Sequence, residues 1–263
     1  MPTIFVQWKQ GGLFLSLLLT FLFLFFMGSL IGWCIELIFR RFFSRANPQR
    51  KWINPGFLVG PYLPLYGFGL CILYLLSSIS LPEQLPLIWH ILLKLVLMAL
   101  GMTVIEYIAG LIFIKRMNVK LWDYSDQWGN IQGIICPRFS FFWLVLSAVY
   151  YFTIHPYILS ALDWLSRNLV FSFVIGFFYG VFFIDVCYSL NVLAKIRAFA
   201  RKNEIIVYYE QLKAHIDTLR AQQKKKRRFV FALRSEEPLS ELLQGYRQKY
   251  ARFVSDRRQK KTK

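Results

Sequence analysis

The chain of 263 residues has few of the residue types that build metal centres and redox sites. It contains four cysteines and three histidines, and the cysteines are scattered without a C-x-x-C pair. A disulfide framework or a zinc site is therefore not expected, and cysteines that pack as small apolar side chains are the simpler interpretation. We predict no metal and no cofactor for this chain.

The common catalytic motifs are also missing. The sequence has no G-x-x-x-x-G-K-[ST], which excludes ATP hydrolysis through a P-loop in this chain, and it has neither H-E-x-x-H nor G-x-S-x-G. Any chemistry would depend on carboxylates, asparagine and arginine. Whether the chain is an enzyme therefore stays open at the level of the sequence.

Acidic residues are scarce as well. The chain has 14 of them against 32 lysines and arginines, while 56% of its residues are apolar. Soluble domains average about 45–50% apolar residues, so a membrane protein is expected. Residues 1–193 carry 12 basic residues (Lys/Arg) and 7 acidic ones (Asp/Glu). Residues 194–263 carry 20 basic residues and 7 acidic ones. We predict a transmembrane domain over 1–193 and a basic, cytoplasmic, helical tail over 194–263.

Five apolar segments are candidates for membrane-spanning helices, because a helix needs about 20 mostly apolar residues to cross the bilayer. The predicted fold class is all-α, a polytopic membrane helical bundle of about five spanning helices. Pro61 and Pro64 interrupt the second segment, which leaves open whether residues 52–69 form a re-entrant hairpin. The predicted spans are residues 13–39, 57–79, 88–114, 139–154 and 168–193.

The charges of the loops predict the direction of these spans. Loops 40–51 and 115–138 are rich in lysine and arginine, whereas loop 80–87 has no basic residue and loop 155–167 has only Arg167. With five spans, both basic loops and the tail lie on the cytoplasmic side. We therefore predict an N-terminus outside the cell and a cytoplasmic C-terminus.

Four ionisable residues lie inside the predicted spans: Glu36, Lys94, Glu106 and Asp185. A charged Asp, Lys or Arg costs about 2.5–3.5 kcal/mol at the bilayer centre on insertion scales, so such residues usually face the bundle interior. The helical rise places Glu106 and Asp185 about 14 Å from the next cytoplasmic charges, with Glu36 shallower. Glu36 and Arg40 are spaced to pair with each other, whereas Lys94, in the outer half, either snorkels outward or pairs across the bundle.

The polar loop "KLWDYSDQWGNIQG", Lys120 to Gly133, adjoins the half of the membrane that holds the three carboxylates. We predict that this loop covers a polar pocket open to the cytoplasm. For the aromatic residues of the loop, an ordinary belt at headgroup depth is the alternative. The predicted pocket or substrate-path residues are Glu36, Arg40, Asn54, Glu106, Asp123, Tyr124, Asn130, Arg138 and Asp185.

The tail contains "KKKRRFVF", residues 224–231, with five consecutive cations. Cations near an anionic leaflet gain about 1 kcal/mol each, so we expect membrane lipids, including anionic headgroups, as partners of the tail. Nucleic acid is a less favoured partner, because no recognition fold accompanies the charge.

Four fragments together resemble a bacterial family, the putative ABC-transporter type IV or CmpB-like membrane proteins. They are "GWCIELIFRRF", "KWINPGFLVGPYLPLYGFG", an intramembrane "IEY", and "LWDYSDQWGNIQGII" with Trp143 after it, and the resemblance covers roughly residues 28–193. It implies a multi-pass protein of the inner membrane and a permease component with a separate ATP-binding subunit. The matching positions are Glu36, Asn54, Pro55, Gly56, Gly60, Pro61, Glu106, Trp122, Asp123, Tyr124, Ser125, Asn130 and Gly133.

Three functions are open at this point. The first is a transporter permease in which Glu106 and Asp185 line a path, and the second is a membrane-embedded enzyme that acts on a lipid headgroup through these carboxylates. The third is a non-catalytic scaffold whose polar residues hold the helices together. Transport predicts a passage along the broken second segment, whereas an enzyme predicts a pocket open only to the cytoplasmic leaflet. We favour transport because of the resemblance.

Overall fold

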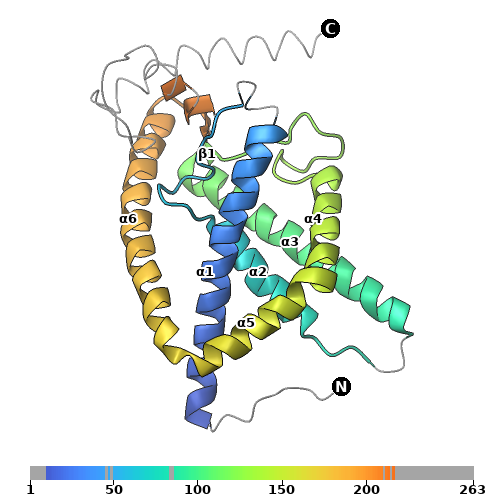
Figure 1. Ribbon diagram of the computed structural model, residues 1–263. Coiled ribbons are helices and arrows are strands. Elements are labelled where there is room, and N and C mark those ends of the chain that lie inside the picture. Colours follow the sequence, from blue (N-terminus) through green and yellow to red (C-terminus); the bar gives the residue numbers. More distant parts are fainter. Residues whose placement is uncertain are drawn as a thin grey trace. The chain divides into compact units, whose positions relative to one another are not determined.

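The computed structural model describes residues 10–44, 47, 50–82, 86–209, 211–213 and 215–216. These residues are mainly helical (Figure 1). They divide into two compact units: one has the residues up to Ile108 and 124–185, and the other has 109–123 and the residues from Val186 onward. The main elements are α1 (Gln10–Phe42), α2 (Pro64–Ser77), α3 (Leu87–Met117), β1 (Val119–Lys120), α4 (Pro137–Val149), α5 (His155–Arg167), α6 (Ser172–Lys202) and β2 (Val207–Tyr208).

Within the described residues, four helices are long and apolar enough to cross a membrane. This confirms the predicted fold class, a polytopic α-helical membrane protein. The second predicted span differs, because α2 has only 14 residues. A helix of that size extends about 21 Å, which is less than the hydrocarbon core of about 30 Å. The four long helices are Ser16–Phe42, Leu87–Met117, Pro137–Arg167 and Leu169–Lys202.

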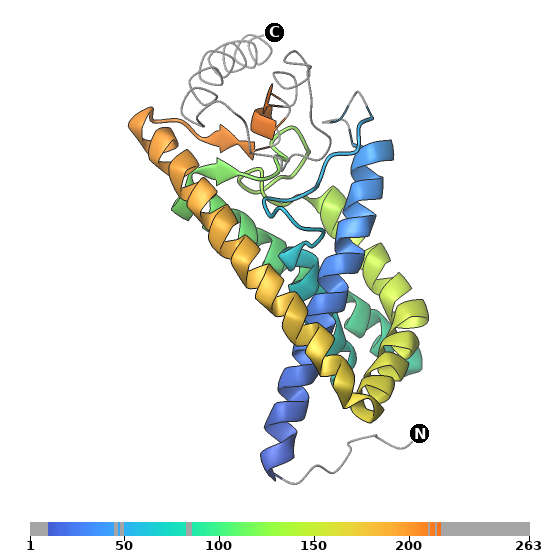
Figure 2. The same ribbon diagram turned by 60° about the vertical axis from the view of Figure 1, so that its left-hand side comes forward.

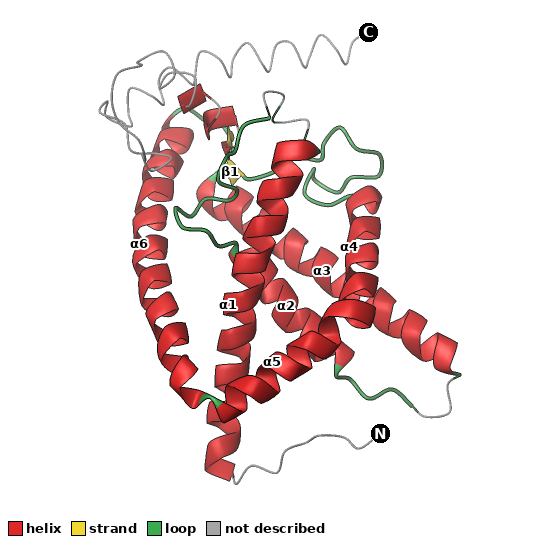
Figure 3. Cartoon of the chain, viewed as in Figure 1, coloured by secondary structure: helices red, strands yellow, loops and turns green. Residues whose placement is uncertain are grey.

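The prolines explain why α2 is short. Pro64 occupies the first turn, where its missing N–H costs little, and Leu63 before it is extended. Residues 50–63 are not helical and form the connection drawn in green between α1 and α2 (Figure 3). The Leu63 N–H donates to the Ser29 carbonyl of α1 at 3.0 Å. Ser29 lies 13 residues before the end of α1, so the non-helical segment reaches about 20 Å along that helix.

Helices α1 and α2 approach each other through glycines. A Cβ atom at Gly32 would overlap the side chain of Tyr66, and one at Gly67 would overlap the Ser29 hydroxyl and lie 2.8 Å from the Phe25 carbonyl oxygen. In membranes, where the apolar effect does not drive helices together, small residues allow this close van der Waals packing. The glycines therefore set the position of α2 against α1.

We expect Gly32→Ala to lower the free energy of unfolding by about 1–3 kcal/mol, because the added methyl group overpacks this contact. The matched control is Gly176→Ala in α6, where no atom lies within 4 Å of the added Cβ. Unfolding of the two variants by SDS titration measures the difference. Equal stability of both variants would contradict close packing at Gly32.

A π-helical turn, Tyr150–Ile154, joins α4 to α5. The helix changes direction at this turn, as Figures 1 and 2 both show. Pro156 follows this turn, and in a regular α-helix its ring would clash with the carbonyl four positions earlier. The His155 N–H bonds Tyr150 O, five positions back, as in a π-helix. The span predicted over 139–154 is helical throughout, and its helix continues to Arg167.

Two apolar clusters centred on α1 hold the first unit together. One joins Leu24 to α2, α3, the π-helical turn and α5, through Leu70, Met98, Tyr150 and Ile158. The other joins Phe23 of α1 to Leu165 and Ile175. Because α1 contributes to both clusters, its apolar faces organise the helices that carry the polar residues described below.

In the second unit, β1 and β2 pair in parallel, with Val119 opposite Val207 and Lys120 opposite Tyr208. Both valines are fully buried. The tail boundary predicted between residues 193 and 194 falls within α6 and stays a prediction. The basic run 224–231 lies outside the described residues.

Candidate functional site

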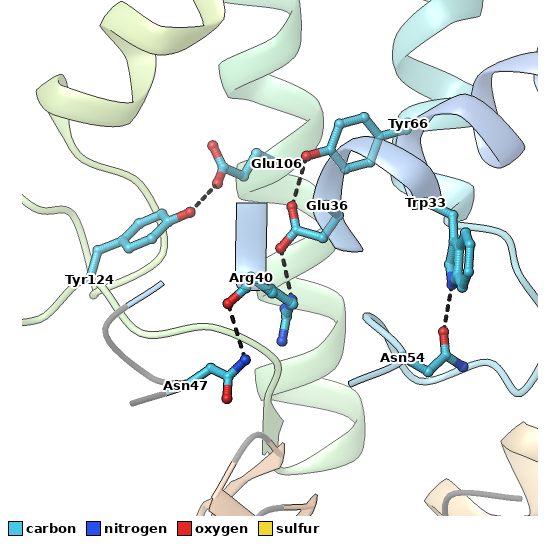
Figure 4. A network of polar contacts seen from close by, with 8 residues as sticks. All are labelled: Trp33, Glu36, Arg40, Asn47, Asn54, Tyr66, Glu106 and Tyr124. Carbon is cyan, nitrogen blue, oxygen red and sulfur yellow. Dashed lines mark hydrogen bonds and ion pairs between the residues drawn. The ribbon is translucent and has the colours of Figure 1, made fainter. Parts of the chain in front are cut away.

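The first part of the site is an ion pair that sequence spacing predicted. Glu36 and Arg40 are one turn apart on α1, and Arg40 Nε donates to Glu36 Oε1 at 2.9 Å. The second oxygen, Oε2, accepts a hydrogen bond of 2.9 Å from the Tyr66 hydroxyl of α2. Asn47 caps the end of α1 by donating to the Arg40 carbonyl at 3.2 Å. Figure 4 shows these contacts.

Glu106 is the second carboxylate of the site. Its side chain is buried, and it accepts one hydrogen bond at each oxygen: from the Tyr124 hydroxyl at 3.0 Å and from Trp143 Nε1 at 2.7 Å. Tyr124 lies in the loop before α4, and Trp143 belongs to α4. Glu106 thus ties the loop and α4 to α3.

The two carboxylates belong to one cluster. The Tyr66 ring, which binds Glu36, lies edge-on to the Trp143 ring, which binds Glu106, with their centroids 6.0 Å apart. Arg40 supplies one positive charge for the two acids, and Glu106 is bonded to neutral donors. A cationic group beside these carboxylates would therefore be stabilised by their charge.

The polar loop from Lys120 to Gly133 is held in shape by its own hydrogen bonds. The Tyr124 N–H donates to the Gly133 carbonyl at 2.8 Å, and Asn130 accepts from the Gly133 N–H while it donates to the Gln127 carbonyl. Gly129 and Gly133 have φ values of +64° and +66°, which favour glycine. Burial, and then the charge of Glu106, raises the pKa of Tyr124, so its hydroxyl stays a donor at neutral pH.

Asp185 of α6 organises the non-helical segment before α2. Its carboxylate accepts from the Val59 N–H at 3.0 and 3.1 Å, from the Gly60 N–H at 2.7 Å and from the Tyr62 hydroxyl at 2.6 Å. In a bilayer, non-helical backbone is tolerated only where protein or enclosed water satisfies its polar groups. Asp185 provides the acceptor for the N–H groups of Val59 and Gly60. Its negative charge also lies near the positive N-terminal end of α2.

Asn54 satisfies backbone carbonyls of the same segment, as Asp185 satisfies its N–H groups. Its amide nitrogen donates to the carbonyls of Leu58 and Val59, both at 3.0 Å, and its oxygen accepts from Trp33 Nε1 of α1 at 2.5 Å. The hydrogen bond between Trp33 and Asn54 holds the segment against α1, about one turn before Glu36 (Figure 4).

A family model described as "Putative ABC-transporter type IV" matches residues 23–190 of the chain, which is more than half of it. The chain belongs to this family. No curated protein and no solved structure matches it.

The match to the ABC-transporter type IV family includes every predicted site residue and ends before the tail. Of these residues, the structure brings Glu36, Arg40, Glu106 and Tyr124 into one cluster. Asn54 and Asp185 support the segment before α2, and Asn130 shapes its own loop. Their roles in binding or transport stay predictions.

The other two predicted residues are placed differently. Asp123 belongs to the second unit and pairs with Lys120 at 2.6 Å. Arg138 is exposed at the start of α4 and donates to Gln127 Oε1 at 3.4 Å.

The sequence reasoning missed most of the donors that hold the carboxylates. Tyr62, Tyr66 and Trp33 are not among the predicted site residues, and Trp143 enters the sequence analysis only through the family resemblance. A signal was available, because a buried Tyr or Trp usually finds a partner for its polar atom. An apolar span that contains both these aromatics and an acid therefore predicts a pairing, although not which residues pair.

Proposed function

We propose that this chain is the permease component of a transporter that relies on a separate ATP-binding subunit. Membership of the ABC-transporter type IV family and the four long apolar helices support this proposal. The sequence contains no P-loop, so ATP would be hydrolysed by another chain. The proposed location is a bacterial inner membrane, with the N-terminus outside and the C-terminus cytoplasmic.

The observation that carries the proposal is the broken second segment. Residues 50–63 run non-helically along α1 and then turn into the 14-residue helix α2. Discontinuous helices with ionisable groups at their ends line the substrate sites of many transporters. We infer a polar cavity open to the cytoplasm beside α2, with Glu36, Arg40, Glu106 and Tyr124 at its wall.

An enzyme that acts on a lipid headgroup is the second candidate, and the gathering of Glu36, Arg40 and Glu106 favours it. A general base needs a carboxylate oxygen within reach of the substrate proton. Here each oxygen of both glutamates already accepts a hydrogen bond from the protein. The contacts therefore argue against a glutamate that is free to act as a general base.

Native mass spectrometry of the protein, purified gently from its own membrane, tests the proposal. We expect a stoichiometric ATP-binding subunit to accompany the wild-type chain and the control variant Asp163→Asn, which alters an exposed ion pair on α5. A tightly held lipid without such a subunit, lost in Glu106→Gln, would instead support the enzyme. A chain with neither partner would leave the scaffold. Anionic lipid bound through the basic tail is a separate expectation of the same measurement.

A further inference from the structure

A second polar cluster lies at the other end of α2. Ser77 ends this helix 11 residues after Tyr66, so the two residues are about 16 Å apart along it. Lys94 of α3 donates from Nζ to the Ser77 carbonyl at 2.7 Å and lies 5.9 Å from the centre of the Tyr151 ring. Lys94 therefore pairs across the bundle, one of the two arrangements that its position predicted.

His155 joins Lys94 at this end of α2 through Ser77. Its Nδ1 lies 3.3 Å from the Ser77 hydroxyl and 3.1 Å from the Tyr150 hydroxyl. The Ser77 hydroxyl already gives its proton to the Tyr74 carbonyl at 2.8 Å. The simplest assignment is that the Tyr150 hydroxyl donates to Nδ1, which places the ring proton of neutral His155 on Nε2.

Some hydrogen-bond donors of this cluster have no partner among the described residues. Lys94 has three N–H groups and uses one of them on Ser77, and it makes no ion pair within the part of the chain that the structure describes. The His155 Nε2 makes no hydrogen bond to any described residue, and the side chain is half-buried. Two donor groups from α3 and α5 thus share Ser77 as a neighbour.

The charge at this position is positive. The C-terminal end of a helix carries about half of a negative elementary charge, whereas the ammonium of Lys94 carries a full positive one. The helix end therefore stabilises Lys94 without neutralising it. An ammonium away from water and without an acidic partner favours an anion, and lysine binds phosphate as a compact point charge.

We propose that Lys94 and His155 bind a phosphate group at the C-terminal end of α2. The two remaining N–H groups of Lys94 and the Nε2–H of His155 donate to the phosphate oxygens. In the tautomer assigned above, the Tyr150 hydroxyl donates to Nδ1 and the ring proton of His155 lies on Nε2. The phosphate belongs either to a lipid headgroup or to a free anion, and both present the same oxygens to these donors.

The test uses the full chain in detergent and compares two probes, phosphatidylglycerol and inorganic phosphate. The stabilisation that each probe gives against thermal unfolding, measured over a concentration series at constant ionic strength, yields its apparent Kd. We expect Lys94→Gln and His155→Gln each to weaken binding at least about tenfold, because each removes a donor to a charged group. Lys94→Arg should retain most of the affinity, since it keeps the charge.

Lys115→Gln is the matched control, because Lys115 is an exposed lysine on the same helix, and we expect it to bind as the wild type does. Binding of phosphatidylglycerol alone would assign the site to a lipid headgroup, and binding of inorganic phosphate without lipid would assign it to a free anion. The proposal is overturned if neither probe binds, or if Lys94→Gln binds as tightly as Lys115→Gln.

Discussion

Asp185→Ala is expected to lower the free energy of unfolding by about 3–5 kcal/mol, the largest loss that we predict for a single residue. The carboxylate accepts from two backbone N–H groups and the Tyr62 hydroxyl, all from the non-helical segment before α2. Alanine would leave these donors without their acceptor. In an environment with little water they would find no replacement, so the segment and the start of α2 would lose their position.

Two further variants separate the parts of this effect. Asp185→Asn keeps the size of the side chain but replaces one acceptor oxygen with a donor, so an intermediate loss is expected. Tyr62→Phe removes a single hydrogen bond to a charged group, which corresponds to about 1.5–3 kcal/mol. SDS titration of the purified variants measures each loss.

The control for Asp185 is Asp163→Ala on α5. Asp163 pairs with Arg167 at 2.7 Å, but both side chains are more than half exposed, at 58% and 75%. Exposed ion pairs contribute about 0–1 kcal/mol, so this variant should stay close to the wild type. If Asp185→Ala were no less stable than Asp163→Ala, the role that we assign to Asp185 would be wrong.

Glu106→Ala is expected to lower the free energy of unfolding by about 2–4 kcal/mol. The substitution breaks the hydrogen bonds from Tyr124 and Trp143, and so it releases the loop and α4 from α3. The control is Thr103→Val, three residues earlier on the same helix, which removes a hydroxyl that also contacts α4, 3.2 Å from the Ser140 hydroxyl. A neutral hydrogen bond of this kind contributes only about 0.5–1.5 kcal/mol.

A double-mutant cycle makes the Glu106 prediction specific. Glu106→Ala and Tyr124→Phe remove opposite ends of one hydrogen bond, so their effects should be non-additive by about 0.5–3 kcal/mol. The pair Glu106→Ala and Tyr62→Phe should be additive, because Tyr62 binds Asp185 instead. Additive effects in the first pair would show that the hydrogen bond between Glu106 and Tyr124 does not hold the loop.

The same variants separate a structural from a functional role. If Glu106 only holds the loop, activity should follow stability across the series. A variant of equal stability, such as Thr103→Val combined with a second mildly destabilising substitution, should then have the same activity as Glu106→Gln. If Glu106 also binds a proton or a cationic group on the path, Glu106→Gln should lose activity in the assembled transporter although it folds. Comparison of activity at matched stability decides between these outcomes.

The sequence predicted the composition of the site better than its geometry. Depth along the helices was enough to place Glu36 and Glu106 in the same half of the membrane, because the helical rise is constant. It also placed Asp185 at that level, but it gave no indication that Asp185 would bind backbone. The partner of Asp185 is a segment 125 or 126 positions away in the chain, and no local pattern reports such a pairing.

By itself, the sequence determined that this is an α-helical membrane protein, where its long spans lie and that its second span is broken. These properties follow from the local run of apolar residues and from prolines that remove backbone donors. The tertiary structure decided the length of α2, the glycine contact that seats it on α1 and the assignment of a donor to each carboxylate. Those features depend on which surfaces meet across the bundle, and only the packing of distant segments determines that.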